Sequence, residues 1–410
     1  MKLLNGGGIA VLRKQLAEID KLMKNGIQKD AGTGLAYFTG YSYNTLYDWD
    51  QYFEALTQIY MGWESKYIKN GVLIFLANQH ADGFIPRHIP VSDCYSPQEH
   101  VKPFLCQIAM LVIDNYGETE WILQDKHIGR LKKYVDYWLN DMDKDKNGLS
   151  EWLSAPHTGM DNQHERAGYW GDGFCEGVDL NCYIAAETAA FSKILKLYGD
   201  NAAAAEYEKI SKKRAETVRK LLWNEEDGIF YDRNIYFNNP GARSPKLPWA
   251  AAANGFPDTE AIRVKSISCF APLACGVATD EQAKRLVFEH LLNTDEFWSV
   301  FPVRTLAKSE RWYSQIPLPS DLGCNWRATT WIPTNYMLVH GLKEYGYNDA
   351  AAAIRWNTER LVKKAGNREY YATDTGAGLG LDPFWGWSLL AHFMKYEEDN
   401  RIINPLLKKS

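Results

Sequence analysis

The sequence predicts an all-α fold, an α/α toroid in which about six helix pairs form a ring. About eleven segments of the 410-residue chain repeat apolar residues at the three- and four-residue spacing of an amphipathic helix. Some segments are apolar on nearly every side, such as 104–117, whereas others carry one strongly charged face, such as 202–223. This alternation is typical of an inner ring of helices packed on both sides and an outer ring facing water.

The expected helices are distributed along the whole chain. The helices, in chain order, are 8–26, 52–63, 67–79, 104–117, 127–141, 178–199, 202–223, 280–292, 334–346, 350–365 and 386–398. The first should end at Gly26, since glycine favours helix C-termini. β signals are few, and 228–234 is expected to contribute to a hairpin. No linker rich in Pro or Ser divides the chain, so we predict one domain over residues 1–410.

Longer segments without helical period connect the helices and should gather at one end of the ring. They are 31–51, 80–103, 143–177, 236–265, 293–333 and 366–387. Nearly all the glycine, tryptophan and charged clusters of interest fall in these loops. Because loops on a rigid scaffold commonly carry function, a functional cleft is expected at that end.

Composition excludes several classes of partner. The net charge is −5 and charged residues make up 24% of the chain, with no basic excess for nucleic acid. No apolar run approaches the roughly 20 residues of a membrane span. The N-terminus lacks the pattern of a signal peptide. A cytoplasmic protein is therefore expected, or a periplasmic one if a signal was removed.

Cysteine and aromatic content add two further expectations. The chain has seven cysteines and no CxxC pair, which favours buried free thiols in a reducing compartment. It also has 15 Trp and 24 Tyr. These fit either a large core or a cleft in which sugar rings stack on aromatic faces, and composition alone does not choose between the two.

The motifs of several enzyme classes are missing. The sequence has no GxSxG, HExxH, phosphate-binding loop or suitable dinucleotide-binding glycine pattern, and its nine histidines are dispersed. No cofactor is therefore expected to be required.

One segment resembles the opening of a calcium loop. In "DMDKDKNGLSEW" (141–152), Asp143, Asp145 and Asn147 place oxygen donors at alternating positions before a glycine. The twelfth position of the loop is Ser154 rather than glutamate, although Glu151 could take its place. A structural Ca²⁺ is one interpretation, and a polar turn after the preceding helix is the other.

Carboxylates remain as the candidates for chemistry. Asp161 lies in "HTGMDNQHERAG" (157–168), Asp50 lies beside Trp49, and Glu369 lies in "NREYYATDTGAG" (367–378). Aromatic surroundings raise a carboxyl pKa, and a nearby Arg lowers it. Two carboxyls in different environments are the minimum for hydrolysing a glycosidic bond. Each carboxyl taken alone is better explained as an ordinary loop residue.

Six motifs in a fixed order resemble a known family. They are "YDWDQYF" (47–53), "DGFIPR" (82–87), "TGMDNQ" (158–163), "LWNEEDGIFYDR" (222–233), "NWRATTWIPTNYMLVHGLKEYGY" (325–347) and "REYYATDTGAGLGLDPFWGWSLL" (368–390). The set is similar to glycoside hydrolase family 63 and its trehalase relatives. The resemblance implies an (α/α)6 barrel and an inverting α-glycosidase.

The same resemblance assigns roles to single residues. It implies that Asp161 is the general acid and Glu369 the general base, whose carboxyl groups should stand roughly 6.5–9.5 Å apart. It places the following residues in the substrate pocket: Tyr43, Trp49, Asp50, Phe84, Arg87, Gly159, Asn162, Trp326, Arg327, Trp331 and Tyr371. Within this set, Asp50 should hold sugar hydroxyls, Gly159 should allow close approach of substrate, and Asn162 should give local hydrogen-bonding support.

Departures from the family pattern fall around this pocket. Asn325 stands where Tyr is common, Ala328 replaces the Gly after the Arg, Thr158 replaces Ser, and 99–104 replaces a Ser-Gln-Pro-Pro segment. Because these changes surround the pocket, they leave the identity of the substrate less certain than the type of reaction. Lys102 and His100 could bind an anionic aglycone such as glycerate, but exposed loop charges are the preferred interpretation.

The expected function is hydrolysis of an α-linked glucose or mannose from a small glycoside or oligosaccharide. The alternatives are a trehalase-type disaccharide hydrolase, a sugar epimerase or lyase on the same toroid, and a sugar-binding module without catalysis. An epimerase would rely on His or Tyr as base, whereas a binding module would lack one of the two carboxylates. The expected partner is a small carbohydrate, with neither nucleic acid nor a membrane.

Overall fold

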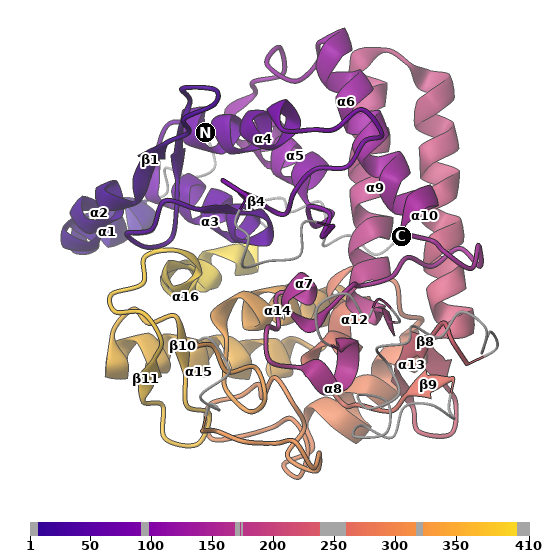
Figure 1. Ribbon diagram of the computed structural model, residues 1–410. Coiled ribbons are helices and arrows are strands. Elements are labelled where there is room, and N and C mark those ends of the chain that lie inside the picture. Colours follow the sequence, from indigo (N-terminus) through magenta and orange to yellow (C-terminus); the bar gives the residue numbers. More distant parts are fainter. Residues whose placement is uncertain are drawn as a thin grey trace.

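Helices form most of the protein. The computed structural model describes residues 7–91, 98–168, 173, 175–237, 260–316 and 323–399. The helices before residue 222 are α1 (Gly7–Gln15), α2 (Ala17–Met23), α3 (Asp48–Met61), α4 (Lys66–Ala77), α5 (Leu105–Tyr116), α6 (Asp125–Asp136), α7 (Ala155–Thr158), α8 (His164–Ala167), α9 (Val178–Tyr198) and α10 (Asn201–Leu221). Those that follow are α12 (Ala271–Ala274), α13 (Asp280–Arg285), α14 (Ile332–Glu344), α15 (Asn348–Ala365) and α16 (Leu390–Phe393) (Figure 1).

Short antiparallel strands pair with one another in the segments that connect the helices. They are β1 (Ile27–Lys29), β2 (Ala36–Phe38), β3 (Leu46–Tyr47), β4 (His88–Ile89), β5 (Cys175–Glu176), β6 (Trp223–Asn224), β7 (Ile229–Phe230), β8 (Asp232–Asn234), β9 (Ala261–Ile262), β10 (Tyr370–Tyr371) and β11 (Gly378–Leu379). Strands pair as β1–β2, β3–β4, β6–β7 and β10–β11, and β8 lies between β5 and β9. The predicted hairpin at 228–234 is therefore divided between two sheets.

The predicted helices are all present, with three differences. The segment 8–26 breaks at Leu16 into α1 and α2. The segments 127–141 and 280–292 begin as α-helices and end in π-helical turns, Tyr137–Asp141 and Leu286–Leu291. The segment 386–398 contains only one α-helical turn, α16, between two 3₁₀ segments. Apolar periodicity predicts a helical segment well, but it does not distinguish these closely related helix types.

The alternation of buried and exposed helices is confirmed. Every residue of α3 is buried, whereas the charged helix α10 buries only a narrow stripe. Helix α9 packs along α10 as a long antiparallel pair, α14 packs on α15, and α5 lies beside α9 (Figure 1). One connected cluster of buried apolar side chains runs from Ile9 to Met394. The core therefore draws on both halves of the described chain.

Helix α3 begins four residues earlier than the sequence predicted. Asp48 and Asp50 lie in its first turn, where carboxylates interact favourably with the helix dipole. The helix ends at Gly62, whose φ of 78° is left-handed. Trp49 and Asp50, expected in a loop, therefore belong to the first turn of a buried and rigid helix.

The segment around Asp161 contains two unpredicted helices of one turn each, α7 and α8. The Ser154 hydroxyl accepts a hydrogen bond from the His157 amide and caps α7. Gly159 ends α7 with a φ of 85°. A single turn is too short to show an apolar period, which is why the sequence indicated only a loop.

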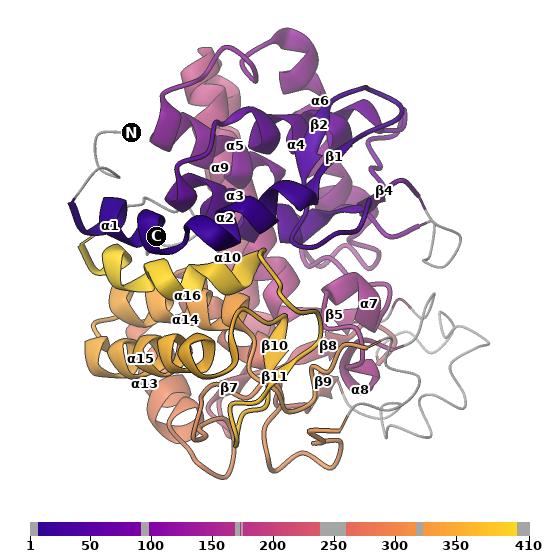
Figure 2. The same cartoon turned by 90° about the vertical axis from the view of Figure 1, so that its left-hand side faces the viewer.

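The first and last described helices meet. Figure 2 shows α16 close to α1 and α2, and α16 packs on α3 and α14. A Cβ atom added at Gly8 would lie 3.2 Å from the Tyr396 ring, so the two ends of the described chain are in contact.

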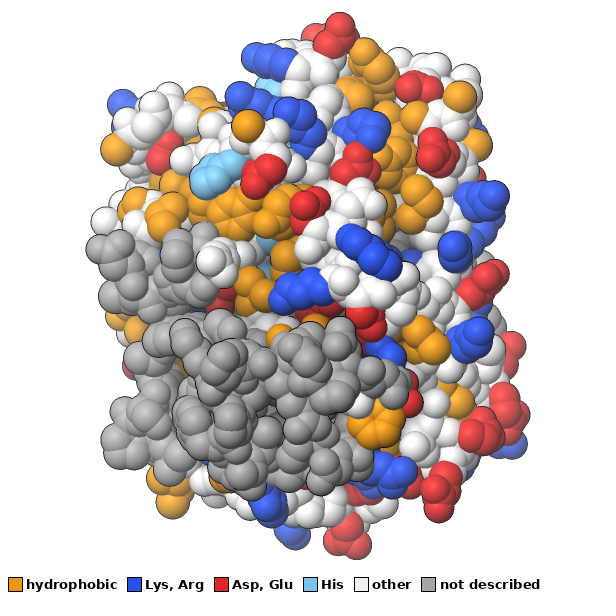
Figure 3. Space-filling view, turned by 45° about the vertical axis from the view of Figure 1, so that its right-hand side comes forward, with side chains coloured by type: hydrophobic (Ala, Val, Ile, Leu, Met, Phe, Trp, Pro, Cys, Tyr) orange, Lys and Arg blue, Asp and Glu red, His pale blue; other side chains and the backbone are white. Residues whose placement is uncertain are grey.

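Surface and thiol chemistry agree with the composition. On the face drawn in Figure 3, basic and acidic side chains are interspersed. Of the helices that the structure describes, none is long and apolar enough to cross a membrane. The six cysteines of the described residues are free thiols, and all except Cys324 are buried. Cys94 lies outside the described residues.

Candidate active site

A pocket of about 270 Å³ brings together residues from both ends of the chain. Nine of the predicted site residues line it: Tyr43, Trp49, Asp50, Arg87, Gly159, Asp161, Trp326, Trp331 and Glu369. The other lining residues are Tyr47, Asp48, Lys102, Pro156, Cys324, Leu381 and Trp387. Asp161 and Glu369 are 208 positions apart in the sequence, yet they line the same pocket.

Asp161 lies in the short connection between α7 and α8 and is partly exposed in the pocket. Burial raises the pKa of Asp161 to about 6, although the positive charges of Arg87 and Lys102 oppose the shift. A carboxyl with this pKa still carries a proton in a sizeable fraction of molecules near neutral pH. Asp161 can therefore act as a proton donor.

Glu369 directly precedes β10 and is held by defined donors. Its Oε2 accepts a hydrogen bond from the Leu381 amide at 3.0 Å. Its Oε1 lies 3.7 Å from the Cys324 sulfur, within reach of the thiol proton. Burial raises the pKa of Glu369, while these two donors lower it. A Cβ at Gly380 (φ 69°) would lie 2.3 Å from Oε2, so glycine is required there.

Asp50 is a second unusual carboxyl in the pocket. Burial and the charge of neighbouring Asp48 raise the pKa of Asp50 to about 8. Asp50 is therefore mostly neutral at pH 7. In that form it can both donate and accept a hydrogen bond with a sugar hydroxyl.

Aromatic rings form one wall of the pocket. Trp326 stacks on Trp331 with 3.8 Å between ring centroids and 12° between planes, and Trp331 stacks on Tyr370 at 4.6 Å. Trp49 lies across Trp326 at 5.8 Å. Such faces suit the C–H surface of a sugar ring. The buried Nε1 of Trp326 has no hydrogen-bond partner within the described part of the chain.

Gly159 makes a close contact that the sequence did not predict. A Cβ at this position would lie 2.8 Å from Cε2 of Trp49, and the φ of 85° disfavours any other residue. Gly159 lines the pocket, but the close contact it permits is with the Trp49 indole.

Two buried ion pairs contribute residues to the pocket lining. The Lys102 ammonium is 2.9 Å from Asp48 Oδ1, and Arg87 Nε is 2.8 Å from Glu99 Oε2. The preferred interpretation of Lys102 and His100 as exposed loop charges is wrong, because both are buried. Lys102 lines the pocket, whereas the His100 ring accepts a hydrogen bond from the Ile85 amide.

Four predicted substrate residues lie outside the pocket lining: Phe84, Asn162, Arg327 and Tyr371. Phe84 packs against the rings of His100 and Tyr137, 5.6 and 5.8 Å away. The Tyr371 hydroxyl donates to the Gly366 carbonyl at 2.9 Å. Asn162 and Arg327 are buried in the two segments that carry lining residues.

Arg166 anchors the segment that carries Asp161. The Arg166 side chain is fully buried and forms ion pairs with Asp179 and Asp232. Asp179 is in the first turn of α9 and Asp232 begins β8. Arg166 therefore connects α8 to two other elements. His157 is also buried, with both ring nitrogens in hydrogen bonds.

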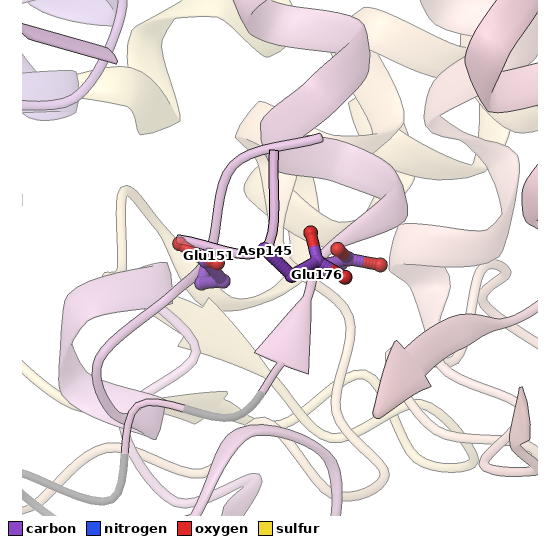
Figure 4. A group of neighbouring side chains, drawn as sticks. All are labelled: Asp145, Glu151 and Glu176. Carbon is purple, nitrogen blue, oxygen red and sulfur yellow. The ribbon is translucent and has the colours of Figure 1, made fainter. Parts of the chain in front are cut away.

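The expected calcium loop gathers a carboxylate cluster that differs from the predicted set. One carboxylate oxygen from each of Asp145, Glu151 and Glu176 lies within 4.8 Å of the others (Figure 4). Glu176 comes from β5, so the local sequence pattern contained no sign of it. Oxygen donors of this kind suit a hard cation. Arg233 also neutralises the cluster, through ion pairs with Asp145 and Glu176.

Two of the predicted calcium ligands, Asp143 and Asn147, accept hydrogen bonds from backbone amides of the turn. Both carboxylate oxygens of Asp143 accept backbone amide hydrogen bonds, from Asn147 at 3.1 Å and Gly148 at 3.0 Å. The Asn147 side-chain oxygen accepts from the Leu149 amide at 2.8 Å. Calcium binding in this loop stays a prediction.

A pair of carboxyls with raised pKa values, set in an aromatic pocket of a mostly helical fold, is the arrangement of a carbohydrate-active hydrolase. Comparison with known families agrees. The family model described as mannosylglycerate hydrolase MGH1-like glycoside hydrolase domain matches residues 43–388. The chain belongs to this family, as the sequence motifs indicated.

Curated relatives match over shorter segments. A mannosylglycerate hydrolase of Thermus thermophilus is 27% identical over 185 residues, 43% of this chain and 35% of that protein. A periplasmic trehalase of Escherichia coli is 25% identical over 226 residues, 52% of this chain and 33% of that protein. The chain thus spans about a third of the length of these relatives.

Solved structures match nearly the whole chain. The GH63 mannosylglycerate hydrolase from Thermus thermophilus in complex with glucose has a TM-score of 0.68 at 16% identity, over 94% of this chain and 99% of that one. Neutral trehalase Nth1 from Saccharomyces cerevisiae has a TM-score of 0.62 at 17% identity, over 93% and 79%. At this identity, the match establishes a shared fold.

Proposed function

We propose that this protein is an inverting α-glycosidase that removes an α-linked glucose or mannose from a small glycoside, with Asp161 as general acid and Glu369 as general base. The proposal includes an (α/α)6 toroid, supported by the alternation of buried and exposed helices and by the fold match to GH63 structures. The observation that carries the proposal is the meeting of these two carboxyls, from distant segments, around one thiol in one pocket.

The two carboxyls have the environments that the two roles require. Asp161, with its pKa raised to about 6, would protonate the glycosidic oxygen as the bond to the anomeric carbon breaks. Glu369 would take a proton from the water that attacks the opposite face of the sugar. At the end of the reaction Asp161 is ionised and Glu369 is protonated, and exchange with solvent restores the starting state.

The pocket also supports a small substrate. Its volume lies near the lower end of the roughly 300–1,000 Å³ typical of ligand sites. The stacked rings of Trp326 and Trp331 would form an aromatic wall beside the sugar ring, and neutral Asp50 would hold a hydroxyl. The named relatives act on mannosylglycerate or trehalose, whose leaving groups are anionic and neutral, respectively. Arg87 and Lys102 line the pocket, but each already forms an ion pair with a carboxylate, so neither leaving group is favoured.

Substrate screening tests the proposal. Trehalose, kojibiose, nigerose, maltose, glucosylglycerate and mannosylglycerate are offered to the purified protein, and NMR follows the anomer released first. We expect hydrolysis of at least one α-glycoside with β-sugar as the initial product. Release of the α-anomer first would contradict inversion. Trehalose as the preferred substrate would identify the trehalase-type alternative.

Variants then test the two roles. Asp161→Asn and Glu369→Gln should each reduce kcat by about 10²–10⁴-fold or more, because each removes a proton-transfer group. Sugar binding, followed by Trp fluorescence, should persist in both. Glu208→Gln, which alters an exposed ion pair with Lys212, is the matched control and should keep full activity. Near-normal turnover in either pocket variant would make its assigned role wrong.

A further inference from the structure

A short segment, residues 323–326, lies between the proposed acid and base. Its Cys324 is the one cysteine of the described chain that is not fully buried, and it lines the pocket. The sulfur lies 3.7 Å from Oε1 of Glu369, and the Asp161 carboxyl lies close enough to the thiol to raise its pKa. One side chain therefore contacts both reacting carboxyls.

The acid side of this segment is fixed by an asparagine next to Asp161. The Asn162 side-chain amide donates to Asn325 Oδ1 at 3.1 Å, and its oxygen accepts from the Trp326 amide at 2.8 Å. Both asparagines are buried. Asn325, the residue that departs from the common Tyr, thus forms half of the contact that joins the segment to the Asp161 loop.

The base side is fixed by a tyrosine next to Glu369. The Tyr370 hydroxyl donates to the Gly323 carbonyl at 2.8 Å. The residues that follow the acid and the base in sequence therefore both bind the 323–326 segment. Its backbone acts as a spacer between the loop of the acid and the loop of the base.

The thiol completes the hydrogen bonding of the base. Leu381 N–H binds Oε2 of Glu369, and the thiol is the donor at Oε1. Burial and the two carboxyls raise the pKa of Cys324 well above its ordinary value, so the group remains a neutral thiol. A thiol has one proton, and the hydrogen bond from Cys324 directs this proton to Oε1 of Glu369, so Asp161 can keep its own proton. This matches the protonation states that the proposed reaction needs.

We propose that Cys324 is a positioning residue that orients Glu369 through its S–H group and sets the spacing between Glu369 and Asp161. This inference rests on the proposed function, because it assigns Glu369 the role of base. Cys324 itself takes part in no bond making or breaking. It acts by holding one oxygen of Glu369 so that the remaining lone pairs face the attacking water.

Two substitutions at Cys324 separate hydrogen bonding from packing. Cys324→Ala removes the donor, and Cys324→Ser keeps a donor on a smaller atom. We expect Cys324→Ala to lower kcat by about 10- to 100-fold, as small displacements of a reacting group do, with KM changed much less. The acid limb of its pH–rate profile should move to higher pH, because loss of the donor destabilises the ionised form of Glu369. Cys324→Ser should recover most of kcat and the original acid limb.

Cys275→Ala is the matched control, since Cys275 is a buried thiol that does not line the pocket. Its kcat and pH profile should equal those of the wild type. Thermal unfolding of all three variants identifies any general loss of stability. Equal kcat and equal acid limbs in Cys324→Ala and wild type would overturn the inference. Equal losses in Cys324→Ala and Cys324→Ser would also overturn it, because a donor would then not matter.

The failure of this inference is distinct from failure of the proposed function. If the wild type hydrolyses no α-glycoside, binding of a cationic iminosugar of gluco or manno configuration gives a second readout. Its affinity depends on the ionisation of pocket carboxyls. Cys324→Ala should shift the pH dependence of that affinity to higher pH, and an unchanged dependence would count against Cys324 even without turnover.

Discussion

At the scale of single residues, three carboxyl groups of the pocket lie in different electrostatic surroundings. Asp161, Asp50 and Glu369 all have a pKa raised by burial, yet their neighbours differ. Asp161 faces Arg87 and Lys102, Asp50 adjoins a second carboxylate, and Glu369 receives two hydrogen bonds. These differences agree with the proposed division of proton donation, hydroxyl binding and proton acceptance among three groups of the same chemistry.

The pKa shifts predict the pH dependence of activity. The proposed mechanism needs Asp161 protonated, so kcat/KM should fall as pH rises through about 6. It also needs Glu369 ionised, and the raised pKa of Glu369 should make kcat/KM fall as pH decreases, at a higher pH than an ordinary glutamate would give. The expected profile is a narrow bell on the acidic side of neutrality.

An aryl glycoside with a good leaving group tests the assignment of the alkaline limb. Such a substrate needs little help from an acid, so Asp161→Asn should retain measurable turnover on it and lose the alkaline limb. Glu369→Gln should not be rescued. An alkaline limb that persists in Asp161→Asn would mean that another group controls it.

Gly159 gives a second prediction at this scale. Gly159→Ala adds a Cβ 2.8 Å from the Trp49 ring at a left-handed φ, so we expect a loss of about 2–4 kcal/mol in the free energy of unfolding, together with a raised KM. Gly117→Ala is the control: its φ is 71° but nothing lies within 4 Å of the added Cβ. It should cost only about 1–2 kcal/mol for the backbone and leave KM unchanged. Urea unfolding and steady-state kinetics measure both.

At the scale of elements, short helices are held in place by buried charges. Helix α8 has a single turn and cannot be stable alone. Arg166 connects it to α9 and β8 through two buried carboxylates, and the same contacts hold the Asp161 loop. The position of the proposed acid is therefore set by a buried ionic cluster rather than by the helix that adjoins it.

Removal of this arginine tests that dependence. Arg166→Met leaves Asp179 and Asp232 buried without their cation, so we expect a loss of about 3–5 kcal/mol in the free energy of unfolding and a reduced kcat. Lys212→Met, which breaks a water-exposed pair with Glu208, should leave both nearly unchanged. A small effect of Arg166→Met on both quantities would show that α8 is fixed by other contacts.

The long helices could be predicted from the sequence because their apolar period is repeated over several turns. Helices α7 and α8 could not be predicted, since a single turn carries no period. The π-helical ends lay within segments predicted as helical, but their helix type could not be predicted. Asp161 and Glu369 were predicted from the family resemblance. Cys324, Leu381 and Trp387 were missed, because their importance depends on contacts with distant residues that no local pattern records. Glu176 was missed for the same reason.

At the scale of the molecule, both halves of the chain contribute residues to the pocket lining. Trp49 and Asp161 come from the first half, and Trp326 and Glu369 come from the last hundred residues. The core is likewise shared between them. With this arrangement, the proposed acid and the proposed base can come together only after most of the chain has folded.

The contact between the first and last described helices has a consequence for chain connectivity. Since Gly8 and Tyr396 adjoin, a linker could join the two ends of the described chain, and the backbone could be reopened elsewhere. The exposed turn at Gly199–Asp200 between α9 and α10 suits such a cut, because Asp200 would keep its hydrogen bond to the Ala203 amide at the new start. A circular permutant of this design should fold and retain the pocket, because the order in which the segments are synthesised is separate from the way they pack.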